Sequence, residues 1–391
     1  MLIKNLRIVL PDALIERGAL RIEGQQIVEI AEGDFPTNGA RVVDGSGLTA
    51  IPGIIDMHGD MLEREIEPRP GASFPAELAI FELDKRLVAA GVTTAYAALS
   101  FIAVDDEASV RKLSRVLDTL ATIERLRPAL LSELFVHARF EVATPSVAGA
   151  LVDALEAGHI QLLSLMDHTP GQGQYRNIEQ YVGFMIKWRR VDRAMVEAEI
   201  SERIAKADPQ ANWLLARDIA TLAAQRGIAL ASHDDDTLEK VDLVASLGAT
   251  ICEFPVTLEA AEEARRRGMH VVMGAPNALR GTSHSGNLSA RDAIAAGAVD
   301  LLAADYHPAS LVHAAFRIAA DGLLSLPAAV ALVSANPAAA LGLADRGRLE
   351  LGMRADLALV EAPLGATPRV RATLRNGTPV YWDAAMAGRD R

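Results

Sequence analysis

The stretch PGIIDMHGD, residues 52–60, carries the clearest structural signal in the chain. An apolar run from Leu48 to Met57 ends at His58, and Asp60 follows two positions later. Imidazole nitrogen and carboxylate oxygen both bind zinc-like ions, and barrel enzymes build their sites at the carboxyl ends of strands. With 9 histidines in the chain, one His-x-Asp triplet is weak evidence alone and needs matching patterns elsewhere.

The composition predicts a chain that folds around a large core. It has 391 residues, 50% of them hydrophobic, enough for a barrel of about 250 residues with an appendage. No apolar run approaches the roughly 18 residues that span a bilayer, and the first residues alternate like a strand, unlike a signal peptide. We therefore expect a soluble, cytoplasmic protein.

Charge and cysteine content narrow the function classes. The net charge is −12 and no basic tract is present, which argues against binding to nucleic acid or an anionic membrane. A phosphorylated substrate stays open, because local arginines and backbone N–H groups bind anions. The single cysteine, Cys252, lies in an apolar stretch, so we expect a buried, inert thiol and a reducing compartment.

The two ends of the chain carry the same strand-like pattern. Residues 1–52 and 346–391 contain short alternating segments, and Asn376-Gly377 is a strong hairpin signal. We predict that these two ends form one small β-sandwich domain. Residues 53–345 are predicted to form the second domain, with a helical insertion at about 175–209 that is a candidate lid.

Between the ends, strand-like runs alternate with helical periodicity. The expected strands are residues 53–58, 92–99, 134–142, 160–166, 228–232, 250–254, 270–274 and 300–304. Such repetition gives a parallel sheet, and eight units favour closure into an α/β fold of the (β/α)8 TIM barrel type. An open doubly wound sheet is the competing fold, but no Gly-x-Gly-x-x-Gly follows the first strand.

Five of the expected strands end in side chains that bind metal ions. These are His58 and Asp60; Glu141; Asp167 and His168; His233, Asp234 and Asp235; and Asp305 with His307. A purely structural barrel needs no such ring, so the clusters together predict a metal site. Two ions about 3.5 Å apart require a bridging carboxylate and share a water that they make acidic.

Several of these residues have alternative roles. Glu141 is the candidate bridging carboxylate, and a salt bridge to Arg139 is its simpler alternative. Asp305 is the candidate general base, or else it caps the helix near Ser310. His137 fits either the barrel interior or a layer behind the ligands. Asp234 is expected to orient a ligand; caps or structural roles are expected for Asp235, Asp236, His159, His270 and His313.

Residues 275–287, APNALRGTSHSGN, have the character of a phosphate-binding loop. Arg280 and His284 supply charge, and small residues let the backbone approach a ligand. Barrels commonly bind phosphate near strands seven and eight, although an ordinary Gly/Ser turn is the alternative. Further candidate groups for the anion site are Arg139, Gln172, Arg176, Lys187, Gly281, Thr282, Ser283, Ser285, Gly286 and Asn287.

These motifs resemble a known family. PGIIDMHGD, ANPAAALGL (335–343) and GRLELGMRADLALV (347–360) are similar to the amidohydrolase superfamily, and the likeness covers nearly the whole chain. More narrowly, SLMDHTPGQ (164–172) and RGTSHSGN (280–287) resemble the diphosphatases of the carbon–phosphorus lyase pathway. The resemblance implies hydrolysis of a phosphorylated sugar phosphonate, α-D-ribose 1-methylphosphonate 5-triphosphate, to the 5-phosphate and pyrophosphate in phosphonate catabolism.

The resemblance also implies a site with two divalent ions. The implied ligands are His58, Asp60, Glu141, His168, His233 and Asp305. Zinc is expected, with manganese and iron also compatible. A metal hydroxide would attack the α-phosphorus, with Asp305 managing the proton. Arg280 and His284, with backbone donors near Gly281 and Gly286, would neutralise charge on the leaving pyrophosphate.

Three features depart from the usual superfamily pattern, and other functions stay open. Asp60 replaces the second histidine of His-x-His, no bridging lysine is present, and His168 and His233 follow strands four and five, one earlier than usual. Either a strand is missing from the count or the ligand set is shifted.

Two alternative functions stay open. One is a cyclic amide hydrolase or deaminase, which needs no anion loop, and the other is a metal-free barrel that serves as a binding subunit. A homodimer is the default expectation.

Overall fold

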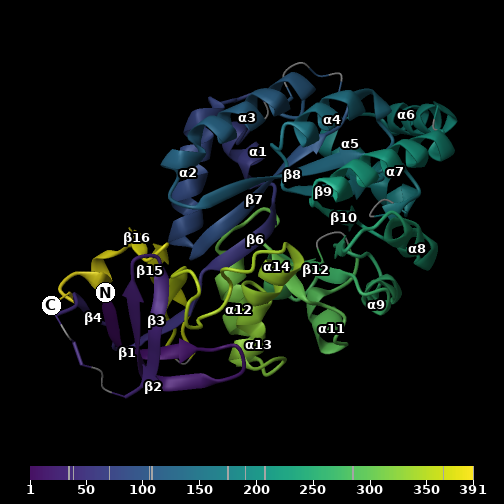
Figure 1. Ribbon diagram of the computed structural model, residues 1–391. Coiled ribbons are helices and arrows are strands. Elements are labelled where there is room, and N and C mark those ends of the chain that lie inside the picture. The colour runs from purple at the N-terminus through teal and green to yellow at the C-terminus, as the bar shows by residue number, and fades with distance from the viewer. Residues whose placement is uncertain are drawn as a thin grey trace.

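The computed structural model describes most of the chain. It describes residues 1–391 except 34, 35, 38, 70, 105, 107, 108, 174, 175, 190, 207, 284, 285, 364 and 391, and except the side chains of 180, 184, 187–189, 202, 203, 205 and 206. Two sheets organise it, and Figure 1 places the sheet made from both chain ends beside a larger unit of strands and helices. No helix in the described part has the length and apolar character needed to cross a membrane.

The larger unit is a parallel barrel. Its strands are β6 (Ile54–Gly59), β7 (Val92–Phe101), β8 (Glu133–Glu141), β9 (Leu162–Met166), β10 (Ala229–His233), β11 (Ile251–Glu253), β12 (His270–Gly274) and β13 (Leu301–Ala303). Neighbours in the sheet follow chain order from β6 to β13, and a bridge between Gly59 and Asp305 joins the first strand to the last. The predicted barrel and its eight strands are confirmed, so no strand was missing from the count. His168 and His233 do follow the fourth and fifth strands.

Helices connect the strands and cover the outside of the barrel. They are α1 (Met61–Ile66), α2 (Ala76–Ala89), α3 (Leu113–Leu126), α4 (Ala148–Glu156), α5 (Ile178–Arg189), α6 (Arg193–Lys206), α7 (Pro209–Gln225), α8 (Leu238–Ser246), α9 (Leu258–Arg266), α10 (Ala275–Arg280), α11 (Ala290–Ala295), α12 (Ser310–Ala320), α13 (Leu326–Ala331) and α14 (Ala335–Ala340). Thr237, Thr257 and Ser289 begin α8, α9 and α11, each accepting a backbone N–H of the first turn. Helices α5 and α6 occupy most of the segment predicted to be an insertion, and their role as a lid stays a prediction.

The inward side chains of the barrel change from apolar to polar along the strands. An apolar layer in the barrel interior contains Met57, Tyr96, Leu162, Ala231, Ile251, Val272, Leu301 and Ala303. Side chains alternate along a strand, so the next inward position lies two residues further on. That position holds Ser164 in β9, His233 in β10 and Glu253 in β11, all buried. The polar end of the barrel therefore rests on an apolar floor.

The second sheet is assembled from both ends of the chain. Its order is β16 (Thr378–Trp382), β15 (Arg369–Arg375), β14 (Leu357–Glu361), β5 (Leu48–Pro52), β1 (Leu2–Val9), β2 (Leu14–Glu23) and β3 (Gln26–Glu32), and β4 (Val42–Asp44) pairs with β1. Strand β5 joins the halves, antiparallel to β14 and parallel to β1. The predicted hairpin is confirmed, because Asn376 and Gly377 have φ of 52° and 73° between β15 and β16. The exact domain boundaries stay a prediction.

A buried ion-pair cluster ties the last part of the chain to the start of β8. Glu133 accepts hydrogen bonds from Arg346 and, at 2.7 Å, from Arg354. The side chains of these arginines are only 8% and 12% exposed. Arg346 also donates to Thr94 Oγ1 at 3.1 Å. Removing Glu133 would therefore leave two largely buried cations with fewer partners, which is costly.

We predict that Glu133→Ala lowers the stability of the folded chain by about 2 kcal/mol, because it uncovers buried positive charge. Glu16→Ala is the matched control: Glu16 pairs with Arg7, its side chain is 72% exposed, and a loss below about 1 kcal/mol is expected. Thermal unfolding midpoints of the two variants provide the comparison. Equal midpoints would show that the cluster does not stabilise the fold.

Candidate metal centre

The seam at which the barrel closes brings three predicted ligands together. The N–H of Asp305 donates to the carbonyl of His58 at 3.0 Å, and the N–H of Asp60 donates to the carbonyl of Asp305 at 2.8 Å. Asp305 has a φ of 57°, a left-handed conformation that aspartate tolerates better than most residues. The seam is supported from inside by Asp56, whose Oδ1 accepts the N–H of Ala304 at 2.9 Å.

A second group of candidate ligands lies at the ends of β8, β9 and β10. His168 Nδ1 donates to Glu141 Oε2 at 2.7 Å, and His168 N donates to Glu141 Oε1 at 3.0 Å. Asp234 Oδ2 lies 3.0 Å from His233 Nδ1 and 3.5 Å from His168 Nε2. His168, His233 and Asp234 each offer one ligand atom within 4.8 Å of the others. These three residues form the first candidate site for a divalent ion.

The two groups face each other through their histidine rings. The ring of His233 lies 5.4 Å from that of His58 and 5.8 Å from that of His168. Phe254 packs edge-on against His58 and His233, with ring centroids 4.9 and 5.3 Å away. The structure therefore gathers the six predicted ligands at one end of the barrel, and their binding of metal stays a proposal.

Some predicted roles differ from the observed contacts. Glu141 makes no ion pair with Arg139 among the contacts of the described residues; its oxygens hold His168 instead, and a bridging role would require it to release that ring. Asp305 does not cap α12, which begins after Ala309 without a side-chain cap. Nor does Asp235 or Asp236 cap α8, because Thr237 does.

Asp235 instead belongs to a buried cluster behind the site. Its Oδ2 accepts hydrogen bonds from Ser232 Oγ and, at 3.3 Å, from Cys252 Sγ. Cys252 is fully buried, as predicted, and burial raises the pKa of its thiol. This thiol is therefore not a nucleophile at neutral pH.

Arg139, predicted to bind the substrate anion, lies among the ligands. Its side chain is buried, and Nη2 donates to His233 Nε2 at 3.3 Å. Because a guanidinium only donates, His233 Nε2 is unprotonated and its ring proton is on Nδ1, facing Asp234. The positive charge of Arg139 also lowers the pKa values of Asp60 and Asp305 against the effect of burial. Arg139 thus balances carboxylate charge at the closing seam.

Burial and neighbouring charges shift the acid–base properties of the centre. Burial, reinforced by Asp60, raises the pKa of Asp305 to about 7. Burial alone would lower the pKa of His168, but hydrogen bonds with Asp234 and Glu141 raise it to about 9. Burial alone would raise the pKa of Asp234, yet His233 and His168 hold it below its usual range. Without metal, the centre therefore holds protons near neutral pH that a cation would displace.

The donor set fits divalent ions. It mixes imidazole nitrogen with carboxylate oxygen, as zinc, manganese and iron sites do. Asp60 Oδ1 is buried and has no hydrogen-bond partner in the described part of the chain, so it is an acceptor that lacks a cation or donor. A bound divalent ion would give this oxygen a partner beside the other candidate ligands.

Asn277 links the start of the predicted phosphate loop to the residues that follow it. Asn277 Nδ2 donates to the carbonyl of Leu288 at 2.9 Å, and its Oδ1 accepts the N–H of Ala290 at 3.1 Å. Arg280 ends α10 with an exposed side chain, and Gly281 follows with a φ of 80°.

For the other residues predicted to bind the anion, the structure gives mainly their exposure. Ser283 and Asn287 are half-buried, and Gly286, Gln172 and Arg176 are exposed. His284, Ser285 and the side chain of Lys187 lie outside the described residues. The anion site therefore stays a proposal.

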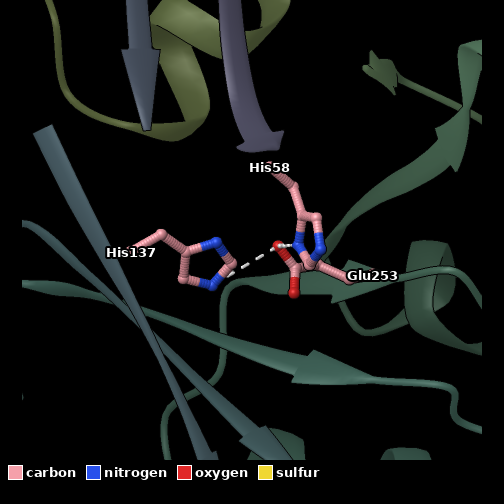
Figure 2. Close-up of side chains that lie close together, drawn as sticks. All are labelled: His58, His137 and Glu253. Atoms are coloured by element: carbon pink, nitrogen blue, oxygen red, sulfur yellow. Dashed lines mark hydrogen bonds and ion pairs between the residues drawn. The ribbon is translucent and has the colours of Figure 1, made fainter. Parts of the chain in front are cut away.

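Glu253 is the residue that sequence reasoning missed. It ends β11, is fully buried, and its Oε1 lies 3.1 Å from His58 Nδ1 and 3.7 Å from His137 Nε2. Figure 2 shows both imidazole rings directed toward this carboxylate. His137, left open by the sequence, is thus in the barrel interior. The sequence did contain a signal for it: Glu253 ends the sixth strand, just as the other candidate metal-binding residues end theirs.

A closed parallel barrel with metal-binding side chains at the carboxyl ends of its strands is typical of metal-dependent hydrolases. The chain belongs to the amidohydrolase family, whose model matches residues 182–381. The alpha-D-ribose 1-methylphosphonate 5-triphosphate diphosphatase of Escherichia coli (strain K12) is 39% identical over 365 residues, covering 92% of this chain and 94% of that protein. The predicted resemblance is thereby confirmed, and the chain is a hydrolase by family.

Two more distant proteins are similar to the chain, one in sequence and one in structure. The dihydroorotase of Geobacter sulfurreducens (strain ATCC 51573 / DSM 12127 / PCA) is 24% identical, covering 90% of this chain and 87% of the relative. The crystal structure of N-isopropylammelide isopropylaminohydrolase from Burkholderia multivorans ATCC 17616 has a TM-score of 0.65 at 22% identity, covering 97% of this chain and 98% of that one. This structural likeness concerns the fold alone.

We predict that affinity for divalent ions rises steeply with pH between 6 and 8. Below pKa values of about 7 for Asp305 and about 9 for His168, an ion must displace a proton from each group. Each proton that must be displaced lowers the apparent affinity for the ion about tenfold for every pH unit below the pKa of its group. Chelator-competition titrations at pH 6, 7 and 8 measure this slope. Asp305→Asn should reduce the slope below pH 7, and an unchanged slope would contradict the assignment.

Proposed function

We propose that this chain is a metal-dependent diphosphatase that hydrolyses α-D-ribose 1-methylphosphonate 5-triphosphate to the 5-phosphate and pyrophosphate. The observation that carries the proposal is the convergence of the predicted ligands at one end of the barrel, in a chain 39% identical to a protein with that activity. In the proposed reaction water attacks the α-phosphorus, the bond from that phosphorus to the α–β bridging oxygen breaks, and pyrophosphate leaves with that oxygen.

The proposed ion ligands are those predicted from the sequence, with Asp234 added. They are His58, Asp60, Glu141, His168, His233, Asp234 and Asp305. Divalent ions held there supply an acidified water and offset charge on phosphoryl oxygens. Zinc remains the expected metal. Metal analysis that finds less than about one ion per chain in protein purified without chelators would favour the metal-free binding subunit instead.

Asp305 is proposed to accept the proton of the attacking water. The backbone of Asp305 is hydrogen-bonded to those of His58 and Asp60, two proposed ion ligands, and a carboxylate beside an ion-bound water is a suitable general base. Asp60, attached to the same seam, keeps negative charge beside it and so favours proton uptake. Arg139 limits this effect, and it is close enough to the ligands to balance the carboxylates when phosphate oxygens enter.

Arg280 and the loop that follows it are proposed to bind the departing pyrophosphate. An exposed guanidinium at the end of α10 offers paired donors that match phosphate oxygens. His284 is proposed to act with it, together with backbone N–H groups near Gly281 and Gly286. These contacts would stabilise negative charge as it grows on the leaving group.

A cyclic amide hydrolase is the second candidate. The distant likeness to a dihydroorotase favours it, because a water activated by divalent ions can attack carbon as well as phosphorus. An anion loop discriminates between the two, since a neutral amide offers no phosphate chain for Arg280 to bind.

We predict that metal-replete wild-type chain releases pyrophosphate from the ribose phosphonate triphosphate and leaves a cyclic amide unchanged. Asp305→Asn should lower kcat by about 100-fold or more, because general-base catalysis contributes at least that factor. A coupled pyrophosphate assay on matched metal-loaded samples measures both. Amide turnover without pyrophosphate release would refute the diphosphatase and keep the hydrolase.

We further predict that Arg280→Gln lowers kcat/KM for the triphosphate about 10- to 100-fold, the range for losing charge-assisted hydrogen bonds. Metal content should not change, because Arg280 is not among the proposed ligands. The control is Arg317→Gln on α12, an arginine 61% exposed that pairs with Asp321. Equal kcat/KM values for the two variants would show that the loop does not bind the phosphate chain.

A further inference from the structure

The buried cluster around Glu253 lies beneath the proposed metal centre and has no role in it so far. It consists of His58, His137, Glu253 and Ser164, all 2% exposed or less. Figure 2 shows the Glu253 carboxylate between the two imidazole rings, at the end of β11. A charged side chain at this depth is costly unless it is paired and hydrogen-bonded, so its partners should reveal its purpose.

Both oxygens of Glu253 have a donor. His58 Nδ1 lies 3.1 Å from Oε1, and Ser164 Oγ donates to Oε2 at 2.9 Å. His137 Nε2 is 3.7 Å from Oε1, which is too long for a hydrogen bond. The carboxylate is therefore satisfied by His58 and Ser164, and its geometry does not require an ion of its own.

The contact determines where His58 carries its proton. A carboxylate accepts hydrogen bonds and does not donate them, so the ring nitrogen that faces it, Nδ1, must be the protonated one. A neutral imidazole has one proton, which leaves the lone pair of Nε2 available for a metal ion. Carboxylates that fix a ligand histidine in this way raise its basicity and its affinity for metal.

The same strand end also restrains the orientation of the ring. Phe254, the residue after Glu253, packs edge-on against His58 with a ring-centroid distance of 4.9 Å. Its φ of 53° is rare for an aromatic residue, and the surrounding packing must offset the strain. The strained backbone directs the Phe254 ring against His58 and His233, while Glu253 stays inside the barrel.

We infer that Glu253 is a positioning residue: it holds His58 as the Nδ1–H tautomer, so that Nε2 is the nitrogen presented to a divalent ion. This inference rests on the proposed metal-dependent function, although not on its substrate. Glu253 touches neither the ion nor the substrate in this account. Its loss should weaken metal binding first and reduce turnover only through the lost metal.

The test uses two variants and one matched control in the full-length chain. Glu253→Gln keeps the shape and an acceptor oxygen but removes the charge, and Glu253→Ala removes both. Glu259→Gln makes the same charge change at an exposed position on the following helix, α9. If the alanine variant does not fold, the glutamine variant still tests the inference.

The first measurement is the tautomer of His58 in metal-free protein labelled with ¹⁵N-histidine. Its resonances are assigned by their absence from His58→Gln. We expect Nδ1–H in the wild type and in Glu259→Gln, and a larger share of Nε2–H in Glu253→Ala. An Nε2–H form in the wild type, or an unchanged tautomer in Glu253→Ala, would overturn the inference.

The second measurement is the dissociation constant for zinc by chelator competition. We expect an increase of about 10-fold in Glu253→Gln and up to about 100-fold in Glu253→Ala, with none in Glu259→Gln. Loss of one whole ion with unchanged affinity for the rest would make Glu253 a ligand and overturn the positioning role. Failure of the proposed diphosphatase function would give a different result. The wild type would then bind zinc and show the expected His58 tautomer, yet release no pyrophosphate.

Discussion

The closure of the barrel at its seam is the constraint on which the site depends. Backbone hydrogen bonds between His58 and Asp305 and between Asp305 and Asp60 join residues almost 250 positions apart at fixed separation. Asp56 stabilises this seam from within, and burial raises the pKa of its carboxyl group to about 6. An open sheet would leave His58 and Asp305 on opposite edges, where no common ion could reach them.

Charge balance is the second constraint on the centre. Asp60, Asp234 and Asp305 share a small volume, and burial opposes the ionised form of each. Arg139 and the histidines supply compensating positive charge or protons when no ion is present. Divalent cations would replace those protons, which links catalysis to metal loading and pH. The polar layer tolerates this charge because hydrogen-bonded neighbours, such as Glu253 with Ser164, satisfy the buried groups below.

The sequence predicted the barrel because eight apolar runs have strand length and are separated by helical periodicity. Polar residues follow those runs at the strand ends, and this pattern marked candidate metal-binding residues. The six ligands that the family resemblance implies are among them, and they lie at one end of the barrel. Glu253 escaped because β11 has only three residues and acidic side chains are common in the following helix, so no periodicity marked it. The position of Arg139 among the ligands also required the inward register of β8, which the sequence alone does not fix.

An anomalous difference map from crystals grown with manganese, measured near the manganese absorption edge, tests the proposed metal centre. We expect peaks bounded by His58, Asp60, Glu141, His168, His233, Asp234 and Asp305, and no peak between His58, His137 and Glu253. Peaks among these proposed ligands would establish that the seam and the strand ends form one metal centre. A peak confined to the Glu253 cluster, or no peak in metal-replete crystals, would show that the seam and the strand ends do not form the metal centre.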